Sequence, residues 1–314
     1  MNKISIIGTG SVGSTIAYTL TVMGIASEIV MIDINNEKAL GEALDIRQGT
    51  PFCGACSIYA GDYRDAQDSN IVILTSGIAR KPGQSRLELA QTNVDITKSI
   101  IPEITRYAPD ATYIIVSNPV DILTYTFYKI SGLPENRIIG SGTILDTARL
   151  RARLSEYFNI SQRNVHAYVF GEHGDSSFIP WSVANISNVP INECNALVAG
   201  SDMSMPKFKR EDVEQYVRKS GGRVIERKGA TFYAVSASVC HICKCLLMGI
   251  DTTMTVSTLM HGEYGVDDVA LSVLNIVGKD GARAKVMMPL TDDEISKLRH
   301  SADTLKDVIK NLHI

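Results

Sequence analysis

The chain has 314 residues, of which 45% are hydrophobic, so it is long enough to form two domains around a large buried core. Its formal net charge of -3 leaves no basic excess for binding a nucleic-acid backbone. No apolar run reaches the ~18 residues of a membrane span. Regular glycines in the apolar N-terminal segment argue against a signal peptide, and we expect a cytoplasmic protein.

The first half of the chain alternates short apolar runs with longer amphipathic segments. A helix is predicted over 11–24, directly after the first apolar run. Continuous apolar strands separated by helices are typical of a parallel sheet that is covered on both faces. We therefore expect a Rossmann-type, doubly wound α/β domain over residues 1–143. Its predicted strands are 4–7, 28–32, 71–75, 113–116 and 138–139.

The pattern changes after about residue 145, and we expect an α+β substrate domain over residues 144–314, packed tightly on the first. In the last segment, apolar residues recur at steps of three and four, which indicates one buried face of a helix. Thr291 and Glu294 have the spacing of a capping box at its start. The other predicted elements are an arginine-rich helix near 145, strands at 165–170 and 181–186, and a charged helix at 209–228.

A glycine-rich segment, GTGSVG at 8–13, separates the first predicted strand from the first helix. In this context Gly8 allows a tight turn, Gly10 lets a pyrophosphate approach the backbone, and Gly13 lets the helix pack on the strand. Asp33 ends the second strand about 20 residues later, where a carboxylate binds a ribose 2′-hydroxyl and repels a 2′-phosphate. The pattern predicts NAD rather than NADP. The alternative is a nucleotide-free loop with a helix-capping aspartate.

The segment IARKPGQSR at 78–86 is predicted to be a loop, because Pro82-Gly83 lies at its centre. It carries Arg80, Lys81 and Arg86. A basic loop beside a nucleotide site suggests a lid over an anionic substrate, and the alternative is a solvated charged turn.

Two further segments carry candidate catalytic groups. Asp146 and Arg149 are three residues apart on a predicted helix, so they share one face, either in a site or as a surface ion pair. His173 lies between two glycines in GEHGD at 171–175. Histidine is the usual general acid and base near neutral pH, although a lone histidine is more often structural. The dinucleotide motif and the spare arginines favour a catalytic His173.

Six cysteines include two closely spaced sets, CGAC at 53–56 and CHICKC at 240–245. A zinc site needs four converging ligands, which these spacings alone do not establish. The second set lies in an apolar, helix-like run. We expect buried free thiols and no metal, with a zinc protein as the alternative.

Together these motifs resemble the L-lactate and malate dehydrogenase family over essentially the full length. The matching segments occur in the family's order: GTGSVG, Asp33, RKPGQSR, SNPVD at 117–121, LDTAR at 145–149 and GEHGD. The resemblance implies hydride transfer between NADH and a small 2-oxo acid. It also implies that the chain forms a homodimer or homotetramer.

The resemblance assigns a role to each candidate residue. His173 would give a proton to the substrate carbonyl, and Asp146 would stabilise the protonated imidazole. Arg149 would bind the substrate carboxylate through two hydrogen bonds, and Arg86 would polarise the carbonyl on lid closure. Asn118 would contact substrate and nicotinamide, and Thr231 would line the substrate pocket. Further implied cofactor contacts are Val12, Lys38, Tyr63, Gly77, Ser99 and Ser141.

The substrate-discriminating residues point in two directions. Arg80 stands at the lid position where malate dehydrogenases have arginine and lactate dehydrogenases have glutamine. Closing an unpaired arginine over the methyl group of pyruvate costs about 3 kcal/mol or more, so Arg80 favours oxaloacetate. Arg151 and His166 instead match positions where some bacterial lactate dehydrogenases bind fructose 1,6-bisphosphate, or they are ordinary interface residues. Thr231, in KGATFY, is also of the lactate type.

We give the direct substrate contact more weight, so malate dehydrogenase is the leading expectation and L-lactate dehydrogenase is the alternative. A remote alternative is a nucleotide-binding protein without turnover, because fold alone does not prove chemistry.

Overall fold

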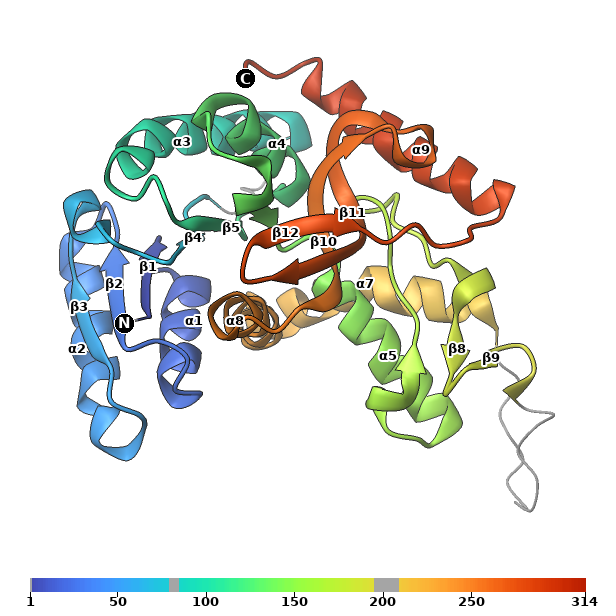
Figure 1. Ribbon diagram of the computed structural model, residues 1–314, viewed down its shortest axis with the longest axis horizontal. Helices are drawn as coiled ribbons and strands as arrows, with labels where there is room; N and C mark the ends of the chain where they lie inside the picture. The colour runs from blue at the N-terminus through green and yellow to red at the C-terminus, as the bar shows by residue number, and fades with distance from the viewer. Residues whose placement is uncertain (1, 79–84, 195–208) are drawn as a thin grey trace.

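A computed structural model describes residues 2–78, 85–194 and 209–314 (Figure 1). Its main feature is a nine-stranded sheet in the order β12-β11-β10-β6-β5-β4-β1-β2-β3. The six N-terminal strands are all parallel. They are β1 (Lys3–Ile7), β2 (Glu28–Ile32), β3 (Ser57–Ala60), β4 (Ile71–Leu74), β5 (Thr112–Ile115) and β6 (Ile138–Gly140).

Four helices accompany these strands and bury their apolar faces against the sheet. They are α1 (Ser11–Val22), α2 (Asn36–Gln48), α3 (Arg86–Tyr107) and α4 (Val120–Ser131). The predicted doubly wound α/β architecture is therefore confirmed. Among the six parallel strands, the pattern did not predict β3, a strand of four residues with a single fully buried side chain, Ile58.

Three antiparallel strands from the C-terminal half extend the same sheet. These strands are β10 (Thr252–His261), β11 (Asp267–Gly278) and β12 (Gly281–Lys285). The junction is the pairing of Ser257 with Gly140 on β6. A side chain at Gly140 would collide with Thr124 and Ser257, so glycine permits this close approach. The sequence pattern did not predict these strands.

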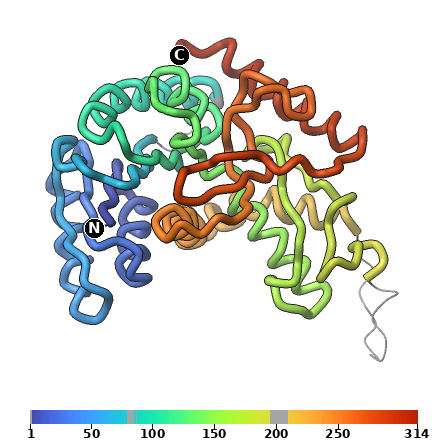
Figure 2. Tube along the Cα trace, in the orientation of Figure 1, coloured from blue at the N-terminus to red at the C-terminus, as the bar shows by residue number. Residues whose placement is uncertain are grey.

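The remaining helices complete the C-terminal half, and Figure 2 shows the last of them running to the C-terminus beside β11. The Thr291–Glu294 capping box begins that helix, as predicted. The helices are α5 (Ile144–Phe158), α7 (Arg210–Lys228), α8 (Tyr233–Met248) and α9 (Asp292–Ile309).

The predicted strands at 165–170 and 181–186 were wrong in extent. The structure has a small sheet of β7 (Val165–His166), β8 (Asn185–Ile186) and β9 (Val189–Pro190). Residues 181–183 form a 3₁₀ turn instead of a strand. Pro180 precedes this turn and has no N–H to donate to a sheet, which disfavours a longer strand.

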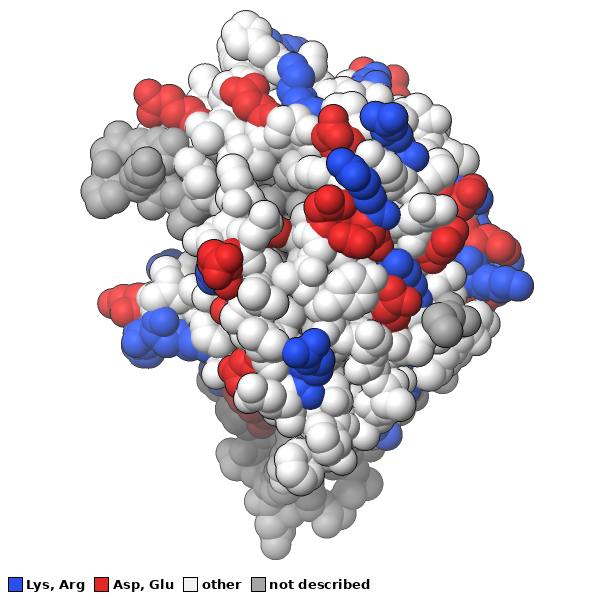
Figure 3. Space-filling model, turned by 90° about the vertical axis from the view of Figure 1, so that its left-hand side faces the viewer, with Lys and Arg blue, Asp and Glu red and all other residues white. Residues whose placement is uncertain are grey.

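The cysteines of α8 are buried as predicted. Cys240, Cys243 and Cys245 pack in a hydrophobic cluster with residues of α1, and all three thiols are free. No group of three or more potential metal ligands occurs within the described ranges. None of the helices in those ranges is long and apolar enough to cross a membrane. On the face drawn in Figure 3, acidic and basic side chains are interspersed.

Candidate active site

The turn between β1 and α1 leaves backbone N–H groups open at the helix start. Gly10 caps α1 without any side-chain hydrogen bond. A Cβ atom added at Gly10 would meet no atom within 4 Å, so the space above this backbone is free. Gly8 has φ of +97°, and a Cβ there would lie 2.7 Å from the Ser76 nitrogen. A side chain at Gly13 would collide with the Gly8 carbonyl, so helix and strand pack closely here.

Asp33 lies beside this turn. Its carboxylate accepts hydrogen bonds from the Thr9 nitrogen at 2.6 Å and from the Asn35 nitrogen at 2.9 Å. Burial alone would raise the pKa of Asp33, but these hydrogen bonds and the charge of Lys38 outweigh burial and lower it. Asp33 is therefore ionised at neutral pH and can accept hydrogen bonds from a diol.

A cavity of about 730 Å³ adjoins both features. Its size, the open helix N-terminus and the ionised carboxylate fit the adenosine and pyrophosphate of a dinucleotide. The helix N-terminus favours the phosphates electrostatically. The predicted cofactor residues that line the cavity are Gly8, Gly10, Asp33, Lys38, Tyr63, Gly77 and Ser99.

A second cavity, of about 620 Å³, contains the candidate catalytic groups. It begins beside Val12, two residues after Gly10 of the first cavity, so the two openings are neighbours at the start of α1. The predicted residues that line it are Val12, Asn118, Ser141, Asp146, Arg149, His173 and Thr231.

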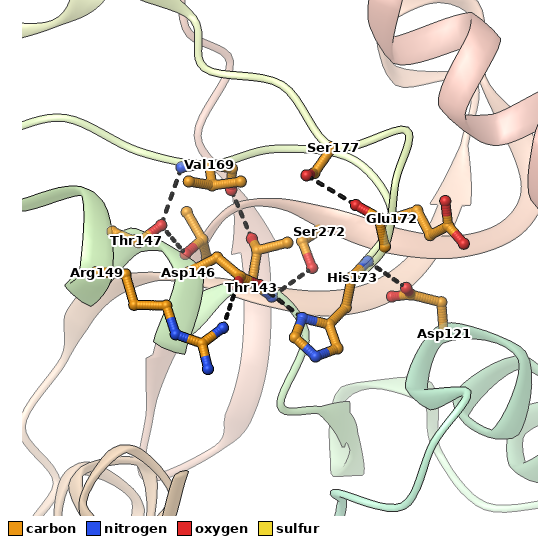
Figure 4. A network of polar contacts seen from close by, with 12 residues as sticks. Asp121, Thr143, Asp146, Thr147, Arg149, Val169, Glu172, His173, Ser177 and Ser272 are labelled. Atoms are coloured by element: carbon orange, nitrogen blue, oxygen red, sulfur yellow. Dashed lines mark hydrogen bonds and ion pairs between the residues drawn. The ribbon is translucent and has the colours of Figure 1, made fainter. Parts of the chain in front are cut away.

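Asp146 contacts both His173 and Arg149, one through each of its carboxylate oxygens (Figure 4). One oxygen lies 2.6 Å from Nδ1 of His173, and the other accepts a hydrogen bond of 2.8 Å from Nη1 of Arg149. The Asp146 side chain is only 11% exposed. Because Nδ1 faces a carboxylate, it carries a proton, and the opposite nitrogen, Nε2, is left for a substrate.

Helix α5 holds Asp146 in its first turn, where the helix dipole favours a negative charge. The start of the helix is anchored to β11, since the Thr143 nitrogen donates to Ser272 Oγ at 3.0 Å. Burial alone would raise the pKa of Asp146, but the charges and hydrogen bonds of His173 and Arg149 outweigh it and lower the pKa.

The pKa of His173 is shifted in the opposite direction. Burial alone would lower it, but the charge and hydrogen bond of Asp146 and the charge of Asp121 outweigh burial and raise it. A raised pKa keeps the imidazole protonated at higher pH, so His173 is suited to donate a proton near neutrality.

Two side chains from distant elements hold the loop of His173. Asp121, on α4, accepts a hydrogen bond of 2.7 Å from the His173 nitrogen. Ser301, on α9, accepts one of 2.8 Å from the Glu172 nitrogen. Gly171, with φ of +92°, turns the chain into this loop. In the sequence, Asp121 stands out only as part of SNPVD at 117–121, and no pattern around Ser301 predicts a role for it.

Burial raises the pKa of Asp121 to about 6, although the His173 N–H and charge act in the opposite direction. This carboxylate is 3% exposed. At neutral pH it places a second buried negative charge beside the loop of His173.

Residues 2–140 match the NAD-binding domain model of the lactate/malate dehydrogenases, and residues 143–313 match the model of their alpha/beta C-terminal domain. The chain belongs to the lactate/malate dehydrogenase family. It is therefore an NAD-dependent oxidoreductase.

Relatives of this family match the whole chain. The L-lactate dehydrogenase of Thermoanaerobacterium saccharolyticum is 46% identical over 100% of both chains. That of Thermoanaerobacter pseudethanolicus is 48% identical, again over 100% of both. Among solved structures, the minor L-lactate dehydrogenase of Enterococcus mundtii is 38% identical with a TM-score of 0.94, covering 100% of this chain and 99% of its own.

The lid predicted for this family enzyme is only partly described. Residues 79–84, which include Arg80, lie outside the described residues, and so does the side chain of Arg86. The backbone after the lid is fixed, because Ser85 and Glu88 form a capping box where α3 begins at Arg86.

The two residues matched to a fructose 1,6-bisphosphate site lie apart from both cavities. Nε of Arg151 donates to the Ala167 carbonyl at 3.1 Å, and the guanidinium stacks over Tyr168 at 5.1 Å. His166 is exposed on β7. Within the described part of the chain, Arg151 and His166 share no hydrogen bond or ring contact.

Proposed function

We propose that this enzyme interconverts pyruvate and L-lactate with NAD. The observation that carries the proposal is the contact of Asp146 with both His173 and Arg149 in one cavity beside the nucleotide site. Full-length similarity to L-lactate dehydrogenases favours pyruvate over oxaloacetate as the substrate.

The charges of the site suit a monoanionic 2-oxo acid. Asp146 neutralises Arg149, so the positive charge that a substrate carboxylate meets in this cavity is that of protonated His173. Nη1 of Arg149 is bound to Asp146, while Nη2 faces Gly221 on α7, where the cavity continues. We assign the carboxylate of the substrate to this side of the guanidinium.

NADH, when bound, supplies the hydride that reduces the carbonyl carbon. His173 Nε2 donates the proton to the carbonyl oxygen, and Asp146 keeps the imidazole in the tautomer with its proton on Nδ1. Asn118 lines the same cavity as His173 and Asp146, and its backbone carbonyl accepts a hydrogen bond of 2.7 Å from Nδ2 of Asn93. From the family resemblance we also assign carbonyl polarisation to Arg86. In the reverse reaction His173 accepts the proton of the alcohol.

The role of His173 is tested by replacing it with asparagine. General acid catalysis contributes roughly 10²- to 10⁴-fold, and kcat for NADH oxidation with pyruvate should fall by that factor. NADH binding, measured by fluorescence titration, should be retained, because His173 is not among the residues that line the first cavity. Full turnover by the variant would rule out this role.

A second candidate substrate is oxaloacetate, because Arg80 favours a second carboxylate. The deciding experiment compares kcat/KM for pyruvate and oxaloacetate in one buffer, with an Arg80→Gln variant alongside. Preference for oxaloacetate that reverses in the variant would replace the pyruvate proposal. Preference for pyruvate in both proteins would show that Arg80 does not set specificity.

We also propose, from the family resemblance, that the enzyme is a homodimer or homotetramer and that Arg151 and His166 bind fructose 1,6-bisphosphate. Adding this sugar phosphate should lower the KM for pyruvate and raise the mass seen by analytical ultracentrifugation. An Arg151→Gln variant should show neither response.

A further inference from the structure

The buried carboxylate of Asp121 has a partner on only one of its two oxygens. Oδ2 accepts the hydrogen bond of 2.7 Å from the His173 nitrogen (Figure 4). Oδ1 is also buried, and it has no hydrogen-bond partner within residues 2–78, 85–194 and 209–314. Because leaving a buried charged oxygen without a donor is costly, we looked for a donor on the neighbouring elements.

Ser257, on β10, supplies such a group. Its side chain is fully buried, and its Oγ has no hydrogen-bond partner in the described part of the chain either. Helix α4 packs against β10. A Cβ atom added at Gly140 would collide with both Ser257 and Thr124, and Thr124 lies one turn after Asp121 on α4. Ser257 and the start of α4 therefore converge on the same point of the sheet.

The two groups complement each other chemically. An ionised carboxylate only accepts hydrogen bonds, whereas a serine hydroxyl can donate one. Burial raises the pKa of Asp121, and the negative charge of Glu172 acts in the same direction. The Ser257 hydroxyl opposes them, together with the N–H and charge of His173. Ser257 thus favours the ionised form of Asp121.

We propose that Ser257 is a positioning residue, whose hydroxyl donates to Oδ1 of Asp121 and holds its negative charge beside the loop of His173. Ser257 lines neither the nucleotide cavity nor the cavity of the catalytic groups, so it acts only through Asp121. This inference rests on the proposed function, since it assumes that His173 is the proton donor.

Two other charged groups face His173 and stay in place when Ser257 is changed. Asp146 raises the pKa of His173, and Arg149 lowers it. The charge of Asp121 adds to the effect of Asp146. Any change in the titration of His173 on replacing Ser257 therefore reports on Asp121.

The test is the pH profile of kcat/KM for pyruvate reduction in Ser257→Ala. Without the hydroxyl the pKa of Asp121 rises, so a larger fraction of Asp121 is protonated near neutrality and His173 loses part of the charge that raises its pKa. Reduction needs protonated His173, so the alkaline loss of activity should move to lower pH. We expect a shift of roughly half a pH unit, no larger than that of Asp121→Asn. Ser257→Cys, whose thiol donates only weakly, should shift the profile in the same direction.

A double variant separates this role from a merely structural one. In an Asp121→Asn background the charge is already absent, so Ser257→Ala should add no further shift. Ser236→Ala is the matched control, because Ser236 is a fully buried serine of α8 whose hydroxyl donates to the Phe232 carbonyl. Its profile should equal that of the wild type.

The possible results distinguish the inference from the proposed function. An unmoved profile in Ser257→Ala, or a shift that persists in the Asp121→Asn background, overturns the role of Ser257 and leaves pyruvate reduction untouched. A wild-type enzyme that reduces no 2-oxo acid overturns the proposed function as well.

Discussion

At the scale of single residues, Asp146 determines the chemistry of the site because it has a different partner on each oxygen. It holds the orientation of His173 and neutralises Arg149 with one buried charge. Removing that charge affects both partners, whereas removing either partner leaves the other contact in place.

Replacing Asp146 with asparagine should therefore have a compound effect. The raised pKa of His173 depends on the carboxylate, and the amide nitrogen of asparagine would oppose either Nδ1 of His173 or the guanidinium of Arg149. We expect kcat/KM for pyruvate to fall by about 10²- to 10⁴-fold. Steady-state kinetics measures this. A loss confined to kcat, with KM unchanged, would contradict the proposed effect on Arg149.

Asp121 provides a pH-dependent prediction. Its buried negative charge raises the pKa of His173. Pyruvate reduction needs protonated His173, so its kcat/KM is maintained at low pH and lost as pH rises through this pKa. Asp121→Asn removes the charge and keeps an oxygen acceptor for the His173 nitrogen, so the alkaline loss of activity should move to lower pH.

The pH profile of kcat/KM measures this shift. Asp45→Asn, at an exposed position of α2, is the control and should leave the profile in place. A profile that does not move in Asp121→Asn would show that Asp121 acts only as a hydrogen-bond acceptor.

At the scale of elements, the loop of His173 is held between α4 and α9. Ser301 is fully buried, accepts the Glu172 N–H and lies 3.0 Å from Ser176 Oγ. The C-terminal helix is thus attached to the loop of His173, the proposed proton donor, although more than a hundred residues separate the two in sequence.

Ser301→Ala should loosen this attachment. It leaves the Glu172 N–H without its acceptor, which costs about 1–3 kcal/mol in the free energy of unfolding. We expect a lower denaturant midpoint and a lower kcat. Ser155→Ala is the control, since the Ser155 hydroxyl donates to the Ala152 carbonyl within α5 itself. Equal kcat in Ser301→Ala and wild type would mean that α9 does not position His173.

Motifs whose residues are close in sequence predicted helices and strands correctly. Elements whose ends depend on contacts between residues far apart in sequence were not predicted correctly. The capping box at Thr291 was readable because its partners are three residues apart. The strand predicted at 165–170 ends early because side chains of α5 hydrogen-bond its backbone: the Val169 nitrogen donates to Thr147 Oγ1 at 2.9 Å. Here a side chain takes the hydrogen bond that a neighbouring strand would otherwise accept. Such a contact produces no periodic pattern in the sequence.

The same distinction holds for the site. GTGSVG, LDTAR and GEHGD combine residue types within short segments, so His173, Asp146 and Arg149 could be proposed from the sequence. Ser301 could not, because a serine on a helix face has no distinguishing neighbours.

At the scale of the whole molecule, one sheet runs through both halves of the chain. β10 continues the parallel strands through β6, and the loop of His173 is hydrogen-bonded to β11 by Gly171 and Ser272. At this junction the edge strand of each half is paired with a strand of the other half, so we expect the two halves to unfold together.

The single tryptophan, Trp181, makes this testable. It is buried in the C-terminal half, with its Nε1 donating to Glu214 on α7 at 2.7 Å. Urea unfolding followed by Trp181 fluorescence should coincide with unfolding followed by far-UV circular dichroism. NADH, which binds the N-terminal half, should move both curves equally. Separate transitions would show that the halves unfold independently.

The contacts of Asp146 with both Arg149 and His173 have a consequence for substrate binding: the site takes up a proton from solvent. Because Arg149 is already neutralised, attraction for an anion depends on the charge of His173. Above the pKa of His173, each substrate anion that binds must bring a proton with it, and affinity should weaken by about tenfold per pH unit. The heat of binding would then vary with the ionisation enthalpy of the buffer, so proton uptake precedes hydride transfer as part of substrate recognition.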